Sequence, residues 1–189
     1  RQQERWRQLT GNFEDLSRIN FLFQEEEKEE ERETILEIPE GFKTLTRPSN
    51  SRSYKAAMNY LATRDIGRSD ILRWKIGYCT EGRYSGRIII PSFNNNGDVN
   101  YFIARSFVGH KRKYLNPPAE KDVIFNELYV DWDEPITLVE GVFDAIAAGE
   151  NAIPVLGSTL RDKTKLFQAI ALNDTPVYLA FDQDAEKKT

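Results

Sequence analysis

The sequence predicts an α/β protein, with a parallel βαβαβ sheet in residues 133–189 and a mixed α+β region before it. Three short apolar runs near the C-terminus alternate with two segments of helical character, which is the pattern of βαβ units. The apolar runs are residues 135–139, 152–156 and 176–181, and the helical segments are residues 143–148 and 160–172. Further upstream, two β-type runs flank an Asn-Gly turn, which predicts an antiparallel hairpin.

The mixed region, residues 38–132, is expected to begin with two helices. Residues 53–62 carry an apolar helical face, and Ser53 can cap the start of this helix. A second, shorter helix is expected at residues 69–74. Strands are expected at residues 75–79, 87–91 and 99–103, with a polar turn at 94–98 between the last two and an exposed basic loop at 111–118.

Residues 1–37 are expected to form a helical segment followed by an acidic linker. Apolar residues recur at helical spacing in residues 1–23, and seven of the nine residues in 25–33 are glutamate. Such a run buries too little apolar surface to fold by itself, so it predicts a tether or a solvated helix. Because the chain begins with Arg1, we expect it to be a segment of a longer protein.

Charge separates the chain into three blocks. Residues 1–40 have a net charge of −6, residues 41–130 of +8, and residues 131–189 of −6. A basic block beside an acidic one suits an enzyme that binds a polyanion with one part and a divalent metal with the other, although solvated faces produce such asymmetry as well. The single cysteine, Cys79, excludes an internal disulfide and favours a buried core thiol in a reducing, cytoplasmic setting.

Four carboxylates follow two of the predicted parallel strands. Glu140 ends the first strand, Asp144 lies one helical turn later, and Asp182 and Asp184 follow the third strand. Functional groups of open α/β sheets gather at the carboxyl ends of the strands. If the first and third strands are neighbours, all four carboxylates converge.

Clustered carboxylates repel one another unless a cation neutralises them, and their hard oxygens suit Mg²⁺ or Mn²⁺. Two such ions can stabilise the attacking and leaving oxygens of phosphoryl transfer. The alternative is structural: Glu-Gly is a turn, and Asp144 only complements the helix dipole. His110 lies outside this cluster and is expected to be a surface residue.

The order strand-Glu-Gly-x-x-Asp, strand-helix, strand-Asp-x-Asp resembles the Toprim domain, a Rossmann-like fold shared by bacterial-type primases, topoisomerases and small nucleases. Glu140 and Asp182 stand 42 positions apart. Upstream segments resemble DnaG-type primases in the family's order. These segments are AAMNYLATRDIGRSDILRWKIGYC (56–79), GRIIIP (86–91), NGDV (96–99) with Ala104-Arg105, KYLNPP (113–118) and FNELY (125–129).

The resemblance implies synthesis of RNA primers on single-stranded DNA by two-metal nucleotidyl transfer. It implies that Glu140, Asp144, Asp182 and Asp184 are catalytic and hold Mg²⁺ or Mn²⁺. It also implies a nucleotide and template path lined by Arg87, Arg105, Lys113 and Asn116, and more loosely by Lys111 and Arg112. Tyr114 in this path could stack on a base, but a packed tyrosine is favoured.

Further partners follow from the same resemblance. Ribonucleoside triphosphates are the expected substrates, a replicative helicase is an expected partner in a primosome, and zinc is expected only in a template-reading module absent from this chain. Two alternatives stay open, a Toprim-type metal-dependent nuclease and a non-catalytic module that binds single-stranded DNA or a helicase.

Overall fold

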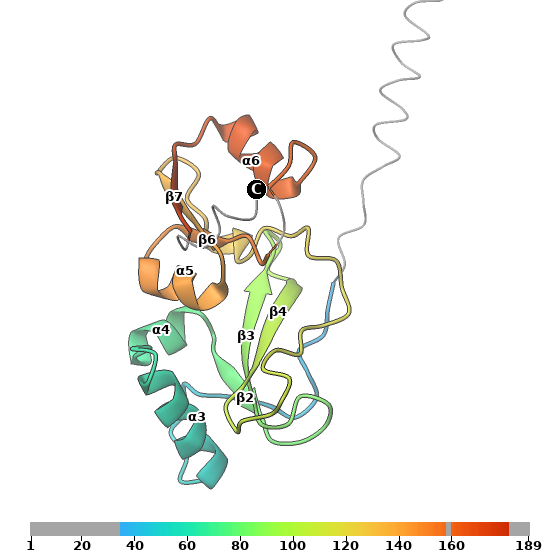
Figure 1. The fold of residues 1–189 in the computed structure, drawn as a ribbon, viewed down its shortest axis with the longest axis vertical. Helices are drawn as coiled ribbons and strands as arrows, with labels where there is room; N and C mark the ends of the chain where they lie inside the picture. Colours follow the sequence, from blue (N-terminus) through green and yellow to red (C-terminus); the bar gives the residue numbers. More distant parts are fainter. Residues whose placement is uncertain (1–34, 158–159, 182–189) are drawn as a thin grey trace, which may run out of the picture. The chain divides into compact units, whose positions relative to one another are not determined.

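A computed structural model describes residues 35–157 and 160–181 (Figure 1). The chain divides between residues 33 and 34, and everything described belongs to the second unit. The expected N-terminal helical segment and the acidic run at 25–33 therefore lie outside the described residues. Within the described part, no helix combines the length and the hydropathy needed to cross a bilayer.

The mixed region forms a four-stranded antiparallel sheet in the order β1-β2-β3-β4. Its strands are β1 (Phe42–Thr44), β2 (Gly77–Cys79), β3 (Arg87–Phe93) and β4 (Val99–Ser106). The predicted hairpin is confirmed as β3 and β4, and both strands are longer than expected because their pairing extends from Arg87–Ser106 to Phe93–Val99. The strand β1 was not expected from the sequence.

Two helices, α3 (Arg52–Ala62) and α4 (Arg68–Arg73), precede the hairpin. Both were expected, but the cap of the first was assigned wrongly. Its N-cap is Ser51 rather than Ser53, because the Ser51 Oγ atom accepts a 3.1 Å hydrogen bond from the Tyr54 backbone N–H.

The C-terminal region forms a parallel sheet in the order β6-β5-β7. Its strands are β5 (Ile136–Val139), β6 (Ala152–Pro154) and β7 (Val177–Ala180), joined by α5 (Val142–Ala148) and α6 (Lys165–Asn173). A short 3-10 helix, Glu127–Tyr129, precedes this sheet. Strand β5 is central, so the first and third parallel strands are neighbours, as the convergence of the carboxylates requires.

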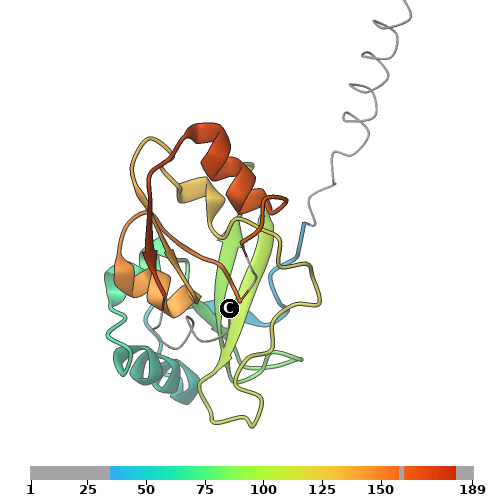
Figure 2. The same ribbon diagram turned by 45° about the horizontal axis from the view of Figure 1, so that its top comes forward.

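Helices α5 and α6 cover opposite faces of the parallel sheet (Figure 2). Leu166 of α6 packs with Ile136, Leu138 and Ile153, whereas α5 packs on the face that carries Val139. Helix α6 begins at residue 165 rather than near residue 160 as expected. The Asp122 carboxylate accepts a 3.1 Å hydrogen bond from the Lys165 backbone N–H, so a contact from a distant loop fixes this helix start.

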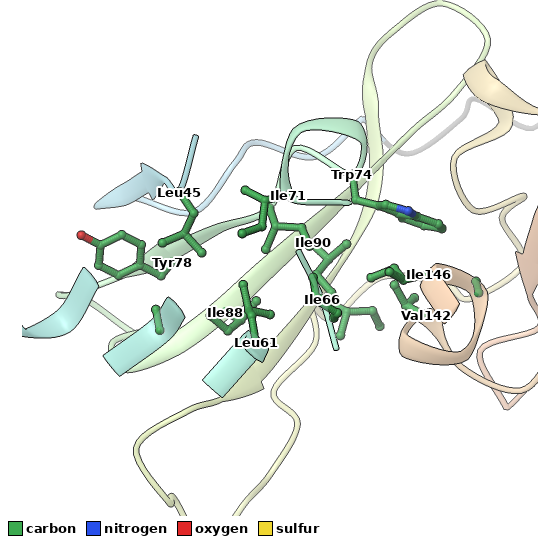
Figure 3. Close-up of a cluster of buried hydrophobic side chains, with 14 of the residues drawn as sticks. Leu45, Leu61, Ile66, Ile71, Trp74, Tyr78, Ile88, Ile90, Val142 and Ile146 are labelled. Carbon is green, nitrogen blue, oxygen red and sulfur yellow. The ribbon is translucent and has the colours of Figure 1, made fainter. Parts of the chain in front are cut away.

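One apolar core joins the two regions (Figure 3). Leu61, Ile71, Ile88 and Ile90 of the antiparallel region belong to the same cluster as α5, which contributes residues such as Ile146. Burial of this many aliphatic side chains supplies most of the stabilisation that folding requires. The core therefore holds α5, and the residues at its start, in place against the antiparallel region.

Candidate active site

Glu140 and Asp144 lie where the central parallel strand passes into its helix. Strand β5 ends at Val139, Glu140 follows, and α5 begins at Val142. Both carboxylates are exposed. The Asp144 Oδ2 atom accepts a 3.1 Å hydrogen bond from the Gly141 backbone N–H, so this carboxylate caps its own helix. Its second oxygen can accept another ligand.

Gly141 permits this close approach. A Cβ atom at position 141 would lie 3.0 Å from the Asp144 Oδ2 atom, which is tighter than ordinary van der Waals contact. A side chain at this position would displace the carboxylate from the backbone, so the glycine is part of the geometry that positions Asp144.

The two carboxylates line one cavity of about 280 Å³ between the two regions. The antiparallel region contributes Ile103, Tyr114 and Asn116, and the parallel region contributes Glu140, Gly141, Val142, Phe143, Asp144 and Leu156. The Asn116 Oδ1 atom accepts a 3.3 Å hydrogen bond from the Ala104 backbone N–H, which ties this side chain to β4. The structure thus brings together three of the predicted site residues, Asn116, Glu140 and Asp144.

The other two predicted carboxylates, Asp182 and Asp184, lie outside the described residues. Strand β7 pairs in parallel with β5, with Ala180 opposite Val139. The last described residue, Phe181, therefore leaves β7 beside the position where Glu140 leaves β5. This register is the one that the predicted four-carboxylate cluster needs.

The donors in the cavity suit a hard divalent cation. Glu140, Asp144 and Asn116 offer oxygen atoms, which are the ligands that Mg²⁺ and Mn²⁺ prefer. Among the described residues, no group of three or more His, Cys, Asp or Glu side chains could hold an ion. The complete metal site, with Asp182 and Asp184, stays a prediction.

Two arginines share one tyrosine hydroxyl at the edge of this cavity. The Tyr60 hydroxyl accepts hydrogen bonds from the Nε atoms of Arg64, at 2.9 Å, and Arg105, at 2.8 Å. The Arg64 guanidinium lies 4.6 Å from the ring centre of Phe143, and that of Arg105 lies 4.5 Å from the ring centre of Tyr114. Both rings line the cavity.

The two arginines form a concentrated positive charge next to the carboxylates. Within the described part of the chain, neither Arg64 nor Arg105 forms an ion pair with an acidic side chain. Each guanidinium donates to a neutral hydroxyl and rests on an aromatic face, and it keeps further N–H groups for an anion. This arrangement favours phosphate groups bound beside the carboxylates.

Arg87 takes a different position from Arg105. Arg105 lies opposite Ile88 in the β3–β4 pairing, on the sheet face that carries α3, whereas the side chain of Arg87 alternates to the other face. Arg87 is 5% exposed, and its guanidinium donates to the backbone carbonyls of Lys113, at 3.1 Å, and Arg112, at 2.9 Å. Burial, and then the charge of Arg112, lower the pKa of Arg87.

The structure therefore makes Arg87 a residue that positions the basic loop, in place of the direct contact that was expected from the sequence. Lys111, Arg112 and Lys113 are exposed on that loop, as expected. The loop continues into residues 113–116, which run beside β4 through hydrogen bonds from Ser106 N–H to Lys113 and from Leu115 N–H to Ala104.

Sequence reasoning missed Arg64 and Tyr60 as site residues. Tyr60 lies near the end of the helix predicted at 53–62, and Arg64 follows four residues later, just beyond it. This spacing is the signal that the two side chains are neighbours. Tyr60 belongs to the apolar face predicted for residues 53–62, but it is only partly buried, and its hydroxyl reaches Arg105. Tyr114 is 42% exposed rather than packed, although Arg105 covers one side of its ring.

Comparisons with known proteins give a consistent result. No family model matches the chain. The DNA primase of Thermotoga maritima is 27% identical in an alignment of 177 positions that takes in 69% of this chain and 31% of the relative. The chain thus spans about a third of the length of the curated relative that it matches.

Solved structures of primases share the fold. The DnaG primase catalytic domain bound to single-stranded DNA matches with a TM-score of 0.60 and 20% identity, covering 72% of this chain and 57% of that one. The RNA polymerase domain of Mycobacterium tuberculosis DnaG matches with a TM-score of 0.59 and 17% identity, over 73% and 63% of the two chains. The Aquifex aeolicus primase, with its zinc-binding and RNA polymerase domains, matches with a TM-score of 0.58 and 21% identity, over 74% and 45%.

The expected fold class, a parallel sheet preceded by a mixed α+β region, is confirmed. The chain is homologous in sequence to a DNA primase and has the fold of the DnaG-type primase catalytic core.

Proposed function

We propose that this chain forms part of the catalytic region of a DNA primase, which joins ribonucleotides into primers on a single-stranded DNA template. The observation that carries the proposal is the cavity in which Glu140, Asp144 and Asn116 lie beside two arginines. Nucleotidyl transfer needs carboxylates for divalent ions and cations for a triphosphate. The cavity supplies the carboxylates, and the arginines at its edge supply the cations.

The carboxylates would act at the reacting atoms of the substrates by holding the divalent ions. Glu140 and Asp144, with Asp182 and Asp184 from the neighbouring strand, would hold Mg²⁺ or Mn²⁺. When bound, these ions polarise the phosphate and stabilise the charge on the attacking and leaving oxygens. The hydrogen bond from Gly141 keeps the Asp144 carboxylate in one orientation.

The two arginines would bind the phosphate groups of the substrate. Arg64 and Arg105 are held about the Tyr60 hydroxyl and against two aromatic rings, so their guanidinium groups lose little freedom on binding. Asn116 supplies an amide on the same wall. The exposed Lys111, Arg112 and Lys113 extend the positive surface for template phosphates, which makes binding sensitive to salt.

Partners belong to the same proposal. The template is single-stranded DNA, the substrates are ribonucleoside triphosphates, and a replicative helicase and a zinc-binding module would direct the enzyme to its sites. A solved relative bound to single-stranded DNA supports the first of these.

Primer synthesis tests the proposal in the protein that contains this chain. Incorporation of labelled ribonucleotides on single-stranded DNA is measured with Mg²⁺ or Mn²⁺ for the wild type, Glu140→Gln, Asp182→Asn and a control, Glu134→Gln. Glu134 is an exposed acid of the same region that does not line the cavity. We expect the first two variants to lose at least about 100-fold in rate and the control to lose nothing.

The same assay separates the alternatives. DNA that shortens without added nucleotide would make the chain a nuclease. Binding of single-stranded DNA without any synthesis, and without an effect of metal chelation, would make it a non-catalytic module. Full synthesis by Asp182→Asn would remove that carboxylate from the site.

A further inference from the structure

A second cavity, of about 320 Å³, lies on the α3 side of the antiparallel region. Its walls include Arg52 and Ala56 of α3, Phe107 after β4, and the polar residues Thr80, Ser85 and His110. This volume is at the lower end of the range of about 300–1,000 Å³ for small-ligand sites. None of these residues belongs to the site described above.

Helix α3 has residues beside both cavities. On α3, residues 52, 56 and 60 recur every four positions and so lie along one side of the helix, and Arg64 follows in the turn after it. Arg52 and Ala56 line the second cavity, whereas Tyr60 and Arg64 lie at the edge of the carboxylate cavity.

Strand β4 and the residue after it repeat this arrangement. Ile103 lines the carboxylate cavity, Arg105 bonds the Tyr60 hydroxyl, and Phe107 lines the second cavity. These alternate residues lie on one face of the sheet. Eight helical residues span about 12 Å, and four strand residues span about 13 Å. That distance corresponds to about four stacked nucleotides of a single strand.

The lining of the second cavity suits a planar heterocycle. The Phe107 ring contacts Tyr78, with ring centres 6.4 Å apart, and is only partly buried, so part of it remains accessible in the cavity. The Ser85 Oγ atom donates to the Thr80 carbonyl at 2.9 Å and keeps lone pairs that can accept from the amine of a base. Arg52 is exposed beside these groups and can reach a phosphate.

The walls of this cavity are already in place. The imidazole Nε2 atom of His110 lies 3.2 Å from the Ser85 carbonyl, which closes the loop after β4 onto the loop before β3. Gly86 permits this closure, because a Cβ atom there would lie 2.6 Å from a Val108 methyl group and its φ is +69°. A preformed cavity binds a ligand without a large ordering cost.

Resting on the proposed function, we infer that the second cavity binds an unstacked nucleobase of the nucleic-acid strand that passes through the carboxylate cavity. Phe107 stacks on the base, the hydroxyl and imidazole groups contact its polar edge, and Arg52 contacts the adjoining phosphate. The cavity thereby fixes the strand at a second point and sets its register in the active site.

The test fills the cavity without removing any native contact. Ala56 is exposed and lines the cavity, so Ala56→Leu occupies space that a base would take, while both residues are strong helix formers. Ala62→Leu is the matched control, since Ala62 is exposed on the same helix and lines neither cavity. Affinity is measured by fluorescence anisotropy with a labelled 12-nucleotide single strand, alone and with one abasic site placed at each position in turn.

We expect Ala56→Leu to weaken binding about 10-fold, as loss of one stacked base does, and Ala62→Leu to leave it unchanged. An abasic site at one position should weaken binding to the wild type but not to Ala56→Leu. Equal affinities for wild type and Ala56→Leu, equal losses in both variants, or no position-dependent abasic effect would each overturn the inference. If the wild type shows these binding results but does not synthesise primers, the proposed function is wrong and the inference about the second cavity stands.

Discussion

The antiparallel and parallel regions support their functional residues in different ways. In the antiparallel region both faces of the sheet are covered, and Arg87, Arg105 and Asn116 are held by hydrogen bonds. In the parallel region Glu140 follows a buried strand but is itself exposed, and the outer strand β7 is exposed on both faces. Neighbouring groups therefore fix the arginine side chains before any ligand binds, whereas the carboxylates are positioned mainly by the backbone that carries them.

Stability should show the largest contrast between the regions. Leu61 is fully buried in the shared core, so Leu61→Ala should lower the free energy of unfolding by about 2–5 kcal/mol, through lost burial and the cavity left behind. Leu179 of β7 is 67% exposed, so Leu179→Ala should change it by no more than about 0.5 kcal/mol. Urea unfolding measures both, and similar losses would contradict the contrast.

The second contrast concerns the arginine pair. Tyr60→Phe removes the hydroxyl that orients Arg64 and Arg105 while keeping the ring, so we expect the Kd for a ribonucleoside triphosphate with Mg²⁺ to rise about 10-fold. Tyr129→Phe, at an exposed tyrosine outside the carboxylate cavity, is the control. Titration calorimetry gives the affinity without requiring synthesis. Unchanged affinity in Tyr60→Phe would show that the hydroxyl does not position the site.

The buried thiol of Cys79 should have a smaller effect, which is on the pH dependence of stability. Burial, and then the charge of Glu81, raise the pKa of Cys79 from 9.0 to about 11. The folded state then keeps this proton while the unfolded state releases it, so stability should fall as pH rises from about 9 to about 11. Urea unfolding should show that the free energy of unfolding falls less between pH 8 and pH 10.5 for Cys79→Ala than for the wild type. Identical pH dependence in both proteins would count against this effect.

The ion pair between the two regions should contribute least to the free energy of unfolding. Arg73 of α4 lies 3.1 Å from Glu150 in the turn after α5, but the two side chains are 38% and 91% exposed. Solvent screens such pairs, so Glu150→Gln should change the free energy of unfolding by no more than about 0.5 kcal/mol. A larger loss would show that this contact, rather than the shared core, holds the regions together.

The sequence predicted the elements that local patterns determine. The β3–β4 hairpin follows from two apolar runs about an Asn-Gly turn, and the parallel sheet follows from apolar runs spaced by helices. The start of α6 was misplaced because Asp122, 43 residues earlier, supplies its first hydrogen bond. Such long-range contacts leave no signal in a local pattern.

The same distinction applies to the site. Glu140 and Asp144 could be proposed from the sequence because strand ends of α/β sheets carry function, and the structure places both in one cavity with Asn116, while their catalytic role stays a prediction. Arg64 is held by contacts with the Tyr60 hydroxyl, which also bonds Arg105 on a strand 45 residues further along, and with the distant Phe143 ring. Arg87 was expected on the same path as Arg105, but strand alternation directs it to the other face, where it supports the basic loop.

The proposed chemistry depends most on the carboxylates acting together as ligands of a divalent ion. Mn²⁺ binding, followed by electron paramagnetic resonance, tests this directly in the wild type, Glu140→Gln, Asp182→Asn and the control Glu134→Gln. We predict that the first two substitutions each weaken Mn²⁺ binding at least about 10-fold and that the control does not. Wild-type affinity in both Glu140→Gln and Asp182→Asn would contradict the account.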